Sequence, residues 1–583
     1  MDTKEQIYLQ TIFTISLGIF IYLYTEPNIY FIATLVIFLT LLILNIYRFI
    51  KKRDILKAPL LLILTTSFLI FALNGLGSRE APQTFEKIDK SINREMVELK
   101  FEGERSLDRV CYYFGVNRNI NFRFGYWGES GWKRFYNYKE NFPYSFKWNC
   151  IDTNITTSKV GILVSKGEAL IGEIEFFDEN NKTIPYSTTL HRLNDEQYIK
   201  PDKSYYSSMF FDEIYFGRTA YEILHKLQIY ETTHPFLGKA LISYGVKLFG
   251  MTPFGWRVID VIFGALIIIA LYYLALTIFK EKRYALFTAT LITYSFMHLT
   301  QARASLIDTF GVFFVITSFI YLYKFLKEQR LHYLIYSAVF FGLAGGVKWS
   351  GLFASMGYLG VLIYIYIIKY PLKDRFRGYR LTLYGLFSYL VIGVLVYFLT
   401  FYIYMENNSF DAILKYQVDM YNYHSNLKAT HPYSSEWYSW IVDYKPMCYY
   451  RETANGLFSS ITAFGNPAIF WTGILGVSIL ACNSLHKKRL ESGFILFAFL
   501  GLYLPYIFIG RLMFIYHFYY AVPFLILAVT YLFKNLFKSK ILFYSYLLVV
   551  IGLFLAFYPV LSGTEVSKSY VDNYLVWFKH WWL

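Results

Sequence analysis

Long apolar runs separated by short polar segments dominate this chain. A run of about 17–25 apolar residues is long enough to cross the hydrocarbon core of a bilayer as an α-helix. The pattern therefore predicts a polytopic α-helical membrane protein. Thirteen candidate spans lie at 7–24, 28–47, 58–76, 256–279, 284–300, 309–326, 333–347, 351–369, 381–404, 464–483, 491–509, 514–533 and 540–560. The runs at 333–347 and 351–369 meet at the sequence GGVKWSG, so they are either one broken helix with a neighbour or two short helices.

Basic residues gather in short connections between these runs. The connections are RFIKKRDILK (48–57), KEKR (280–283), KFLKEQR (324–330), KYPLKDRFRGYR (369–380), HKKR (486–489) and KNLFKSK (534–540). Every second connection is basic, and the positive-inside rule places them together in the cytoplasm. The N-terminus is then inside and the C-terminus outside. The long connections 77–255 and 405–463 and the tail 561–583 are expected to lie outside.

The first long connection has a different pattern. Between residues 79 and 205 the apolar residues alternate with polar ones in short stretches such as MVELKFEG and NINFRFGYW. Turn signals GES, GEA and DENNKT separate these stretches, and this arrangement predicts an extracytoplasmic β-sandwich. The segment 158–184 resembles the closing strands of discoidin-like, galactose-binding jelly rolls, so a sugar-binding module and a structural spacer are both open. Cys111 and Cys150 share this connection and are either disulfide-bonded or buried free thiols.

Composition and charge support the membrane interpretation. The chain of 583 residues is 56% hydrophobic and 17% charged, whereas a soluble protein is about 25% charged. Its formal net charge is +15. Because the basic residues lie in the short loops, they are explained by topology and by anionic lipid headgroups, and no nucleic-acid partner is predicted.

The sequence FFDEIYFG places two adjacent carboxylates, Asp212 and Glu213, in an aromatic setting. They precede a predicted amphipathic surface helix at 215–229. A second surface helix is predicted at 233–250, with His234 and Lys239 near its start. In one interpretation Asp212 caps the first helix and Glu213 faces water. In the other, the aromatic setting raises the pKa of a carboxylate that acts as a base.

Cationic residues recur at the predicted outer ends of the later helices. An isolated Lys or Arg there is explained equally well by snorkelling to the interface. Together with the carboxylates, the set suits an anionic lipid substrate, because a phosphate requires cations and donors. Its members are Arg257, Arg303, Lys348, Arg511 and His517. Asp308 is expected to orient its helix or Arg303, and His431 and Trp437 either cover the site or anchor the second outer loop.

These segments together resemble, in content and order, the protein O-mannosyltransferases. This family belongs to the GT-C superfamily of membrane glycosyltransferases that use polyprenyl-phosphate sugars. The resemblance covers about residues 205–560, with 58–76 as the first core helix. Its motifs are FFDEIYFG, THPFLGK, GWRVIDVIFGAL, ARASLIDTFGVFF, GGVKWSGLF, HPYSSEWYSW, FGNPAIFW and RLMFIYHFYYAVPF.

The resemblance divides the chain into five parts. These are an extra transmembrane hairpin with a basic loop (1–57), the first core helix (58–76), the inserted β-domain (77–205), the catalytic membrane domain (206–560) and an outer tail (561–583). The loop 405–463 is too short for the β-trefoil MIR domain of the eukaryotic enzymes. The chain is therefore similar to a bacterial-type member, which implies a plasma-membrane location.

The resemblance implies an inverting transfer of mannose from a polyprenyl-phosphate donor to Ser or Thr hydroxyls of proteins. Asp212 would be the base, and Glu213 would position the acceptor or hold Asp212. Six residues would bind the donor phosphate or substrate: His234, Lys239, Arg257, Lys348, Arg511 and His517. No cofactor is required by this scheme. Asp212, Glu213 and His234 could bind a divalent metal, but their spacing is no recognised ligand set. A lipid or glycan acceptor is an alternative within the superfamily, and a transporter or flippase of lipid-linked sugar is an alternative of another class.

Overall fold

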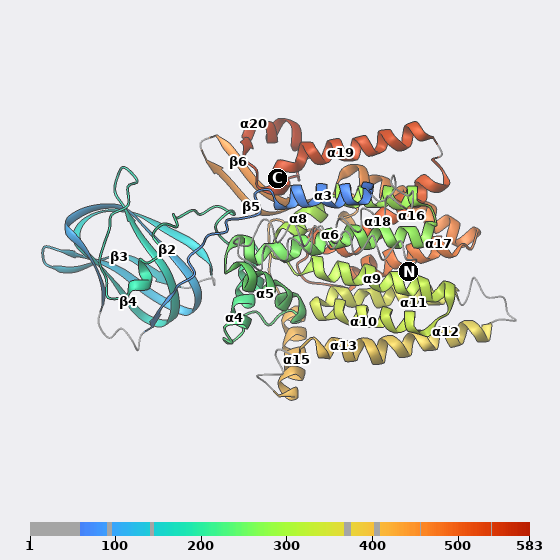
Figure 1. Ribbon diagram of the computed structural model, residues 1–583, viewed down its shortest axis with the longest axis horizontal. Coiled ribbons are helices and arrows are strands. Elements are labelled where there is room, and N and C mark those ends of the chain that lie inside the picture. The colour runs from blue at the N-terminus through green and yellow to red at the C-terminus, as the bar shows by residue number, and fades with distance from the viewer. Residues whose placement is uncertain are drawn as a thin grey trace, which may run out of the picture.

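A helical bundle carries a β region at one end (Figure 1). The computed structural model describes residues 59–89, 96–139, 145–365, 375–401, 409–454, 456–537 and 539–583. The predicted spans at 7–24 and 28–47 lie outside the described residues. The β region, α4, α5, α15 and β5 share the same end of the bundle in Figure 1. The connections predicted to lie on one side of the membrane are therefore brought together in space.

Helices occupy all the other predicted spans. They are α3 (Pro59–Leu73), α6 (Pro253–Phe279), α7 (Lys282–Thr293), α8 (Phe296–Arg303), α9 (Asp308–Glu328), α10 (Leu331–Val347), α11 (Ala354–Tyr364), α12 (Arg375–Ser388), α13 (Val394–Leu399), α16 (Pro467–His486), α17 (Leu490–Tyr503), α18 (Val522–Asn535) and α19 (Lys540–Ser562). Within the described residues, six helical stretches are long and apolar enough to cross a membrane, and four shorter apolar helices accompany them. The prediction of a multi-pass membrane protein is confirmed.

Local signals explain where the long helices begin. Thr252 precedes α6 with an extended backbone, and its hydroxyl accepts a hydrogen bond from the Gly255 amide at 3.0 Å. Asn466 precedes α16, and its side chain accepts from the Ala468 amide at 3.1 Å. Both helices have proline in the first turn, where the missing N–H is not needed.

The single span predicted at 284–300 is wrong, because the helix breaks there. α7 ends at Thr293, and Ser295 is extended before α8 begins. A break inside an apolar environment must satisfy the freed backbone groups. Here the side-chain amide of Asn466 satisfies one of them, because it donates to the Tyr294 carbonyl at 3.2 Å.

Of the two alternatives for GGVKWSG, the structure shows two helices that meet. α10 ends at Val347, and Lys348 is extended, with φ −157° and ψ 143°. A short 3-10 turn, η2 (Trp349–Phe353), then leads into α11. The break places the Lys348 side chain at the end of the bundle that also carries the outer loops.

The β region is an antiparallel sheet with the strand order β1-β4-β2-β3. Its strands are β1 (Glu86–Asp89), β2 (Val97–Gly128), β3 (Gly131–Lys139) and β4 (Lys147–Phe177). Residues 160–162 of β4 pair with both 97–99 and 124–126 of β2, so the two long strands curl the sheet around a hydrophobic core of its own. An inserted β fold is therefore present, but it is built from two long bent strands and not from many short ones. The boundaries at 77 and 205 and the discoidin-like resemblance remain predictions.

The predicted turns of the β region have different outcomes. Gly128 and Gly131 flank a tight hairpin at GES, and DENNKT is a turn after β4, as predicted. GEA is not a turn between strands, because it lies inside β4. Gly167 has φ +74°, and an added Cβ there would lie 2.3 Å from the Asn119 carbonyl oxygen. Glycine thus permits the bend at which β4 passes close to β2.

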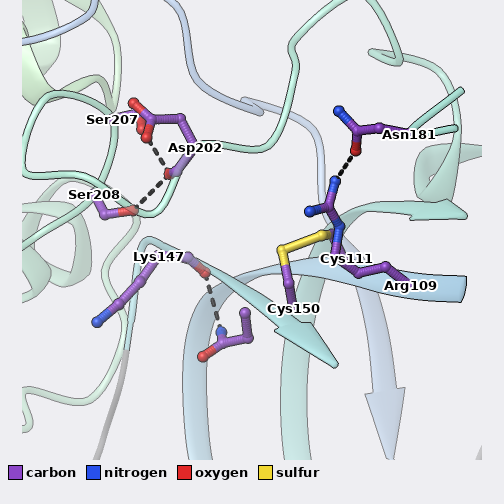
Figure 2. Close-up of a disulfide and its surroundings, with 9 residues drawn as sticks. Arg109, Cys111, Lys147, Cys150, Asn181, Asp202, Ser207 and Ser208 are labelled. Atoms are coloured by element: carbon purple, nitrogen blue, oxygen red, sulfur yellow. Dashed lines mark hydrogen bonds between the residues drawn. A yellow bond between two sulfur atoms is a disulfide. The ribbon is translucent and has the colours of Figure 1, made fainter. Parts of the chain in front are cut away.

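Cys111 and Cys150 form a disulfide across adjacent positions of β2 and β4 (Figure 2). The structure thereby decides between the two alternatives for these thiols. The bond fastens the two long strands together on the side of the β region that faces the Asp202–Ser208 segment in Figure 2. That segment leads directly to Asp212.

The remaining outer elements close the same end of the bundle. They include η1 (His191–Leu193), α15 (Phe410–Asn426), η6 (Trp437–Ser439), β5 (Met447–Ala454), β6 (Leu457–Ala463), η7 (Leu504–Phe508), η8 (Ile515–Tyr520), β7 (Val566–Ser567), α20 (Lys568–Tyr570) and the π-helix η9 (Val571–Leu575). The π-helix η5 (Tyr389–Gly393) lies instead between α12 and α13, inside an apolar helical stretch. The tail adds β7 to the β5-β6 hairpin. The indole N–H of Trp581 donates to the Asp443 carbonyl at 2.9 Å, so the tail packs on the second outer loop.

The two predicted surface helices are α4 (Glu213–Leu224) and α5 (Leu237–Phe249). The helix predicted at 215–229 is present as α4, but its charged residues do not form a solvated face. Its Arg218 and Glu222 are buried and paired at 2.9 Å, and Arg218 also donates to the Asn117 carbonyl of β2 at 2.8 Å. Pairing offsets part of the cost of burying these charges. α4 therefore packs between the β region and the helical bundle.

Candidate functional site

Asp212 is a half-buried residue whose carboxylate has no hydrogen bond or ion pair with any described residue. It stands immediately before α4, and its side chain makes no capping hydrogen bond. The interpretation of Asp212 as a helix cap is therefore not supported. Burial raises the pKa of Asp212 to about 7, with nearby Asp308 and Glu231 raising it further and Lys348 and Arg511 lowering it. A carboxyl group with this pKa can accept and release a proton near neutral pH.

The backbone before Asp212 is held in an unusual conformation. Phe211 has φ +47°, a left-handed conformation that a bulky residue rarely adopts. Its ring stacks on Tyr449 at 4.3 Å between centroids and meets Tyr516 edge-on at 5.8 Å. Such strain persists only when the surroundings impose it. Aromatic packing from two distant segments thus fixes the direction of the Asp212 side chain.

Glu213 does not face water or Asp212, because it is fully buried in an ion pair with Arg257. The Arg257 guanidinium donates to both carboxylate oxygens of Glu213, at 2.6 and 2.7 Å. The Ser305 amide adds a bond of 3.0 Å to Glu213, and Arg257 also donates to the Leu76 carbonyl at 2.8 Å. Glu213 and Arg257 together join α4, α6, the end of α3 and the segment before α9. Neither is free to touch a substrate in this arrangement.

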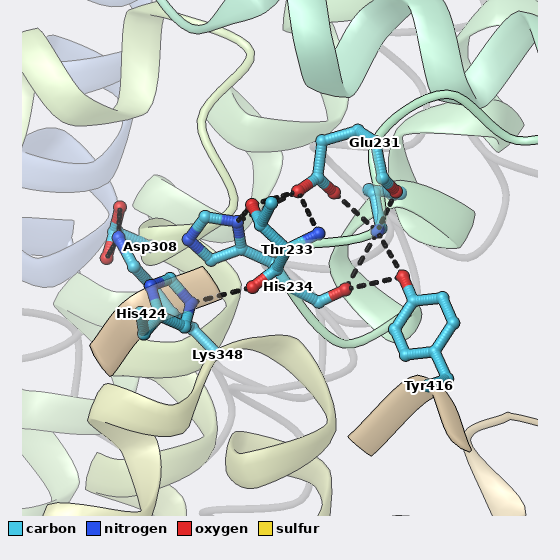
Figure 3. A network of polar contacts seen from close by, with 8 residues as sticks. Glu231, Thr233, His234, Asp308, Lys348, Tyr416 and His424 are labelled. Carbon is cyan, nitrogen blue, oxygen red and sulfur yellow. Dashed lines mark hydrogen bonds and ion pairs between the residues drawn. The ribbon is translucent and has the colours of Figure 1, made fainter. Parts of the chain in front are cut away.

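His234 and Lys239 share a buried acidic partner, Glu231 (Figure 3). The Lys239 ammonium lies 2.6 Å from Glu231, and the His234 Nδ1–H donates to the other oxygen at 3.1 Å. Burial alone would raise the pKa of Glu231, but Lys239 and His234 hold this pKa well below its usual range. Lys239 is enclosed by this carboxylate, two backbone carbonyls and the Tyr416 hydroxyl. It is placed to hold the 231–234 loop and does not face a donor phosphate.

The state of His234 follows from the same contacts. Burial lowers the pKa of His234, so the ring is neutral near pH 7. Because Glu231 accepts the Nδ1–H, the Nε2 atom then carries a lone pair. In that state His234 offers an acceptor to the site. Donation to a phosphate, the predicted role, would require a protonated ring.

Lys348 pairs with Asp308 and brings α9 and the α10–α11 break together. Its ammonium lies 2.9 and 3.0 Å from the two carboxylate oxygens, and both side chains are at most 9% exposed. The prediction that Asp308 orients Arg303 is wrong. Arg303 donates instead to the carbonyls at the end of α3 and to Ser562 at the end of α19. Those orphan carbonyls need donors.

Arg511 differs from these cations, because no described carboxylate pairs with it. It lines a cavity of about 540 Å³ between the second outer loop and the segment before η8. The other lining residues are Ala429, Thr430, His431, Pro432, Ser434, Ser435, Glu436, Gly510, Leu512 and Met513. Arg511 also acts on the charge of Asp212. The cavity therefore brings together His431 and a cation that no described carboxylate pairs with, and Asp212 lies within electrostatic range of that cation.

His517 and Trp437 lie beside this cavity but do not line it. The His517 ring is 5% exposed, with Nδ1 3.0 Å from the Phe514 carbonyl. Trp437 packs edge-on against Tyr503 at 5.4 Å, and its carbonyl accepts from the Tyr503 hydroxyl at 2.9 Å. Trp437 thus anchors the outer loop to α17. Of the two residues predicted either to cover the site or to anchor the loop, His431 is the one that lines the cavity.

Sequence reasoning missed Glu231 and His424. The His424 Nε2–H of α15 donates to the Thr233 carbonyl at 2.7 Å, and its ring lies 5.4 Å from that of His234. Burial, with Arg511 and His234 nearby, lowers the pKa of His424 to about 4. An acidic residue eight positions before Lys239 was a usable signal for Glu231. No local signal marks His424, because its contact spans two outer loops.

Comparison with known proteins adds an independent result. A model described as dolichyl-phosphate-mannose-protein mannosyltransferase matches residues 233–404, and one described as the C-terminal four-TMM region of protein O-mannosyltransferase matches residues 409–581. The chain belongs to the protein O-mannosyltransferase family. Asp212, Glu213 and the whole β region lie before the first matched residue.

Relatives with curated names agree with this membership. The chain is 26% identical over 424 residues to a polyprenol-phosphate-mannose–protein mannosyltransferase of Corynebacterium glutamicum, covering 60% of this chain and 81% of that protein. It is 22% identical over 453 residues to the enzyme of the same name from Mycolicibacterium smegmatis, covering 64% and 87%. Each is similar to this chain over most of its own length.

A solved member of the family shares the fold. The S. cerevisiae protein O-mannosyltransferase Pmt1–Pmt2 complex bound to the sugar donor aligns with a TM-score of 0.55 at 13% identity. The alignment covers 64% of this chain and 89% of that chain. At this identity the likeness concerns the helical fold alone. This O-mannosyltransferase family member has that fold together with an inserted β region.

Proposed function

We propose that the protein transfers mannose from a polyprenyl-phosphate donor to Ser or Thr hydroxyls of proteins, with inversion at the sugar C1. The active site would face the outer side of a bacterial plasma membrane, since the basic connections place the opposite ends of the helices in the cytoplasm. Family membership and the names of the relatives support the donor and the reaction. The observation that carries the proposal is Asp212, whose carboxylate has no partner among the described residues and lies within electrostatic range of Lys348 and Arg511.

In the proposed transfer, one residue takes the proton of the acceptor and another stabilises the leaving phosphate. The acceptor hydroxyl attacks the sugar C1 while Asp212 takes its proton. The C1–O bond to phosphate breaks, and its electron pair leaves with the oxygen of polyprenyl phosphate. Arg511 would stabilise the negative charge on the leaving phosphate. Lys348 would add its positive charge at close range while remaining paired with Asp308.

Glu213, Arg257, Glu231 and Lys239 would act by holding the site together. Both ion pairs are buried. The Arg257–Glu213 pair joins residues 44 positions apart, whereas the Lys239–Glu231 pair spans eight positions and holds the loop between them. In this scheme Glu213 positions Asp212 through the backbone of α4 and does not bind the acceptor itself. Four cations were predicted as phosphate ligands; the scheme assigns that role to Arg511 first.

The test is a transfer assay with the full chain in lipid membranes. It uses polyprenyl phosphate carrying radiolabelled mannose and a pool of Ser/Thr peptides. We expect labelled peptide and an equal amount of free polyprenyl phosphate. Release of polyprenyl phosphate without labelled peptide would favour a lipid or glycan acceptor. Movement of intact donor across the membrane with no release would identify a flippase and overturn the proposal.

A further inference from the structure

Three carboxylates gather in the β region, away from the proposed active site. They are Glu173 on β4 and Asp195 and Glu196 in the segment after η1. One oxygen atom from each lies within 4.8 Å of the others. Three negative charges this close repel one another unless something compensates them.

Glu173 is the central member. The residue is 0% exposed, and its Oε1 accepts the Glu196 amide at 2.6 Å. Its Oε2 is buried and receives no hydrogen bond from the described residues; the side chain facing it is the Asp195 carboxyl. Burial and the two neighbouring acids raise the pKa of Glu173 to about 8. A buried polar atom left without a donor and aimed at other carboxylates points to a ligand that is positively charged.

The other two carboxylates also keep one oxygen without a donor. Asp195 Oδ1 accepts from the Thr84 hydroxyl at 2.8 Å. Glu196 Oε2 accepts from the Gln83 amide at 2.8 Å and from the Thr84 amide at 3.0 Å. These bonds fix both side chains while Asp195 Oδ2 and Glu196 Oε1 stay available. Within the described part of the chain, no lysine or arginine forms an ion pair with any of the three.

Glu175 provides an internal comparison. It lies two residues along the same strand and is similarly buried, but the Lys200 ammonium lies 3.5 Å from its carboxylate. The chain thus supplies a cation to one buried glutamate of β4 and none to the other.

We propose that Glu173, Asp195 and Glu196 bind a hard divalent cation, with Ca²⁺ as the ion that fits best. The donors are all carboxylate oxygens, which suit Ca²⁺ and Mg²⁺ and not zinc or copper. Ca²⁺ tolerates irregular geometry and completes its shell with water and carbonyl oxygens.

The three carboxylates lie beside the segment that connects the helical bundle to the β region. The Gln83–Thr84 segment, which Glu196 and Asp195 hold, links α3 to β1. The Gln83 side chain also exchanges hydrogen bonds with the Met251 backbone, at 2.8 and 3.1 Å, one residue before the α6 cap Thr252. A bound cation would therefore fasten the β region to the entrance of α6.

The experiment measures thermal unfolding of the full chain in detergent with EDTA and with Ca²⁺ up to about 10 mM, a range that covers weak extracellular sites. We expect a saturable rise of several degrees in the unfolding midpoint, since a ligand that binds the folded state stabilises it. Glu173→Gln should abolish the rise, whereas Glu175→Gln should keep it. Tb³⁺ should show luminescence sensitised by nearby Tyr186 and Tyr198, and Ca²⁺ should displace it.

The absence of any Ca²⁺-dependent rise in the wild type would overturn the proposal, as would a full rise in Glu173→Gln. Should Glu173→Gln fail to fold, Asp195→Asn, at an exposed position, gives the same test through loss of Tb³⁺ luminescence. A pH-dependent midpoint that Ca²⁺ does not change would show that the three carboxylates share a proton instead of a metal.

Discussion

Three buried carboxylates at the helical end of the molecule are paired with a cation, whereas the buried Glu173 of the β region is not. At the helical end Glu213, Glu231 and Asp308 each have an arginine or lysine within 2.6–2.9 Å. In the β region Glu173 faces two other acids. Burying a charge without a partner costs several kcal/mol, so an unpaired buried carboxyl is either protonated or compensated by something that binds beside it.

Asp212 belongs to the unpaired class although it lies among paired groups. The adjacent Glu213–Arg257 pair holds the backbone on which Asp212 stands, while the Asp212 carboxylate is left to titrate. The comparison therefore separates residues that hold the site from the residue that acts in it. It also predicts that substituting Asp212 lowers activity without lowering stability, whereas substituting one partner of a buried ion pair lowers stability.

The largest expected effect is the loss of transfer in Asp212→Asn. A general base contributes about 10²–10⁴-fold to the rate, so kcat in the mannosyl transfer assay should fall by that factor. The thermal midpoint should not fall, and above pH 7 it should rise, because a buried charge is removed. Asp419→Asn on the exposed side of α15 is the matched control and should transfer normally. Comparable rates in Asp212→Asn and wild type would remove Asp212 from the mechanism.

Breaking a holding pair should instead unfold the protein. Arg257→Met leaves Glu213 buried without a partner, which costs about 3–5 kcal/mol. Circular dichroism melts in detergent should show a large drop in the midpoint. Adding Glu213→Gln to Arg257→Met should recover part of the loss, because no charge is then left unpaired. If the double variant is as unstable as the single one, the pair is not what holds α4 to α6.

The disulfide should matter for the β region and much less for transfer. Its sulfur atoms join residues 39 positions apart, and closing such a loop stabilises a fold by about 2–4 kcal/mol. The Cys111→Ser/Cys150→Ser variant should expose the β region to protease at lower temperature. Cys482→Ser, at an exposed free thiol, is the control. Equal protease resistance in both variants would contradict this assignment.

The smallest effect should come from an exposed ion pair of the β region. Lys87 lies 2.8 Å from Glu168, but their side chains are 52% and 40% exposed. Such pairs contribute about 0–1 kcal/mol, so Lys87→Met should shift the midpoint very little. A shift as large as that of Arg257→Met would show that burial does not separate the two classes.

The helices could be predicted because length and apolarity are local properties. The break at Lys348 and the unusual carboxylates at Asp212 were also visible, since a charge inside an apolar motif stands out. The break between α7 and α8 was not predictable, because Asn466 compensates it from another helix 172 residues away.

The pairing of the site residues could not be predicted either. Arg257, Lys239 and Lys348 were all identified as cations of one site, yet each turns out to hold a carboxylate from a different segment. Which cation stays free depends on tertiary contacts, and only the structure separates Arg511 from the others. In the β region, the apolar alternation indicated strands, but the curl of β2 and β4 depends on a long-range approach at Gly167.

The central claim, that Asp212 is the base, is tested most directly by the pH dependence of kcat/KM for transfer. A base acts when deprotonated, so the rate should rise with pH and level off above an apparent pKa of about 7, the value to which burial raises Asp212. Arg511→Gln should move the rise to higher pH, because the positive charge of Arg511 lowers this pKa. A profile that is flat from pH 5 to 9, or one that Arg511→Gln leaves in place, would contradict the account.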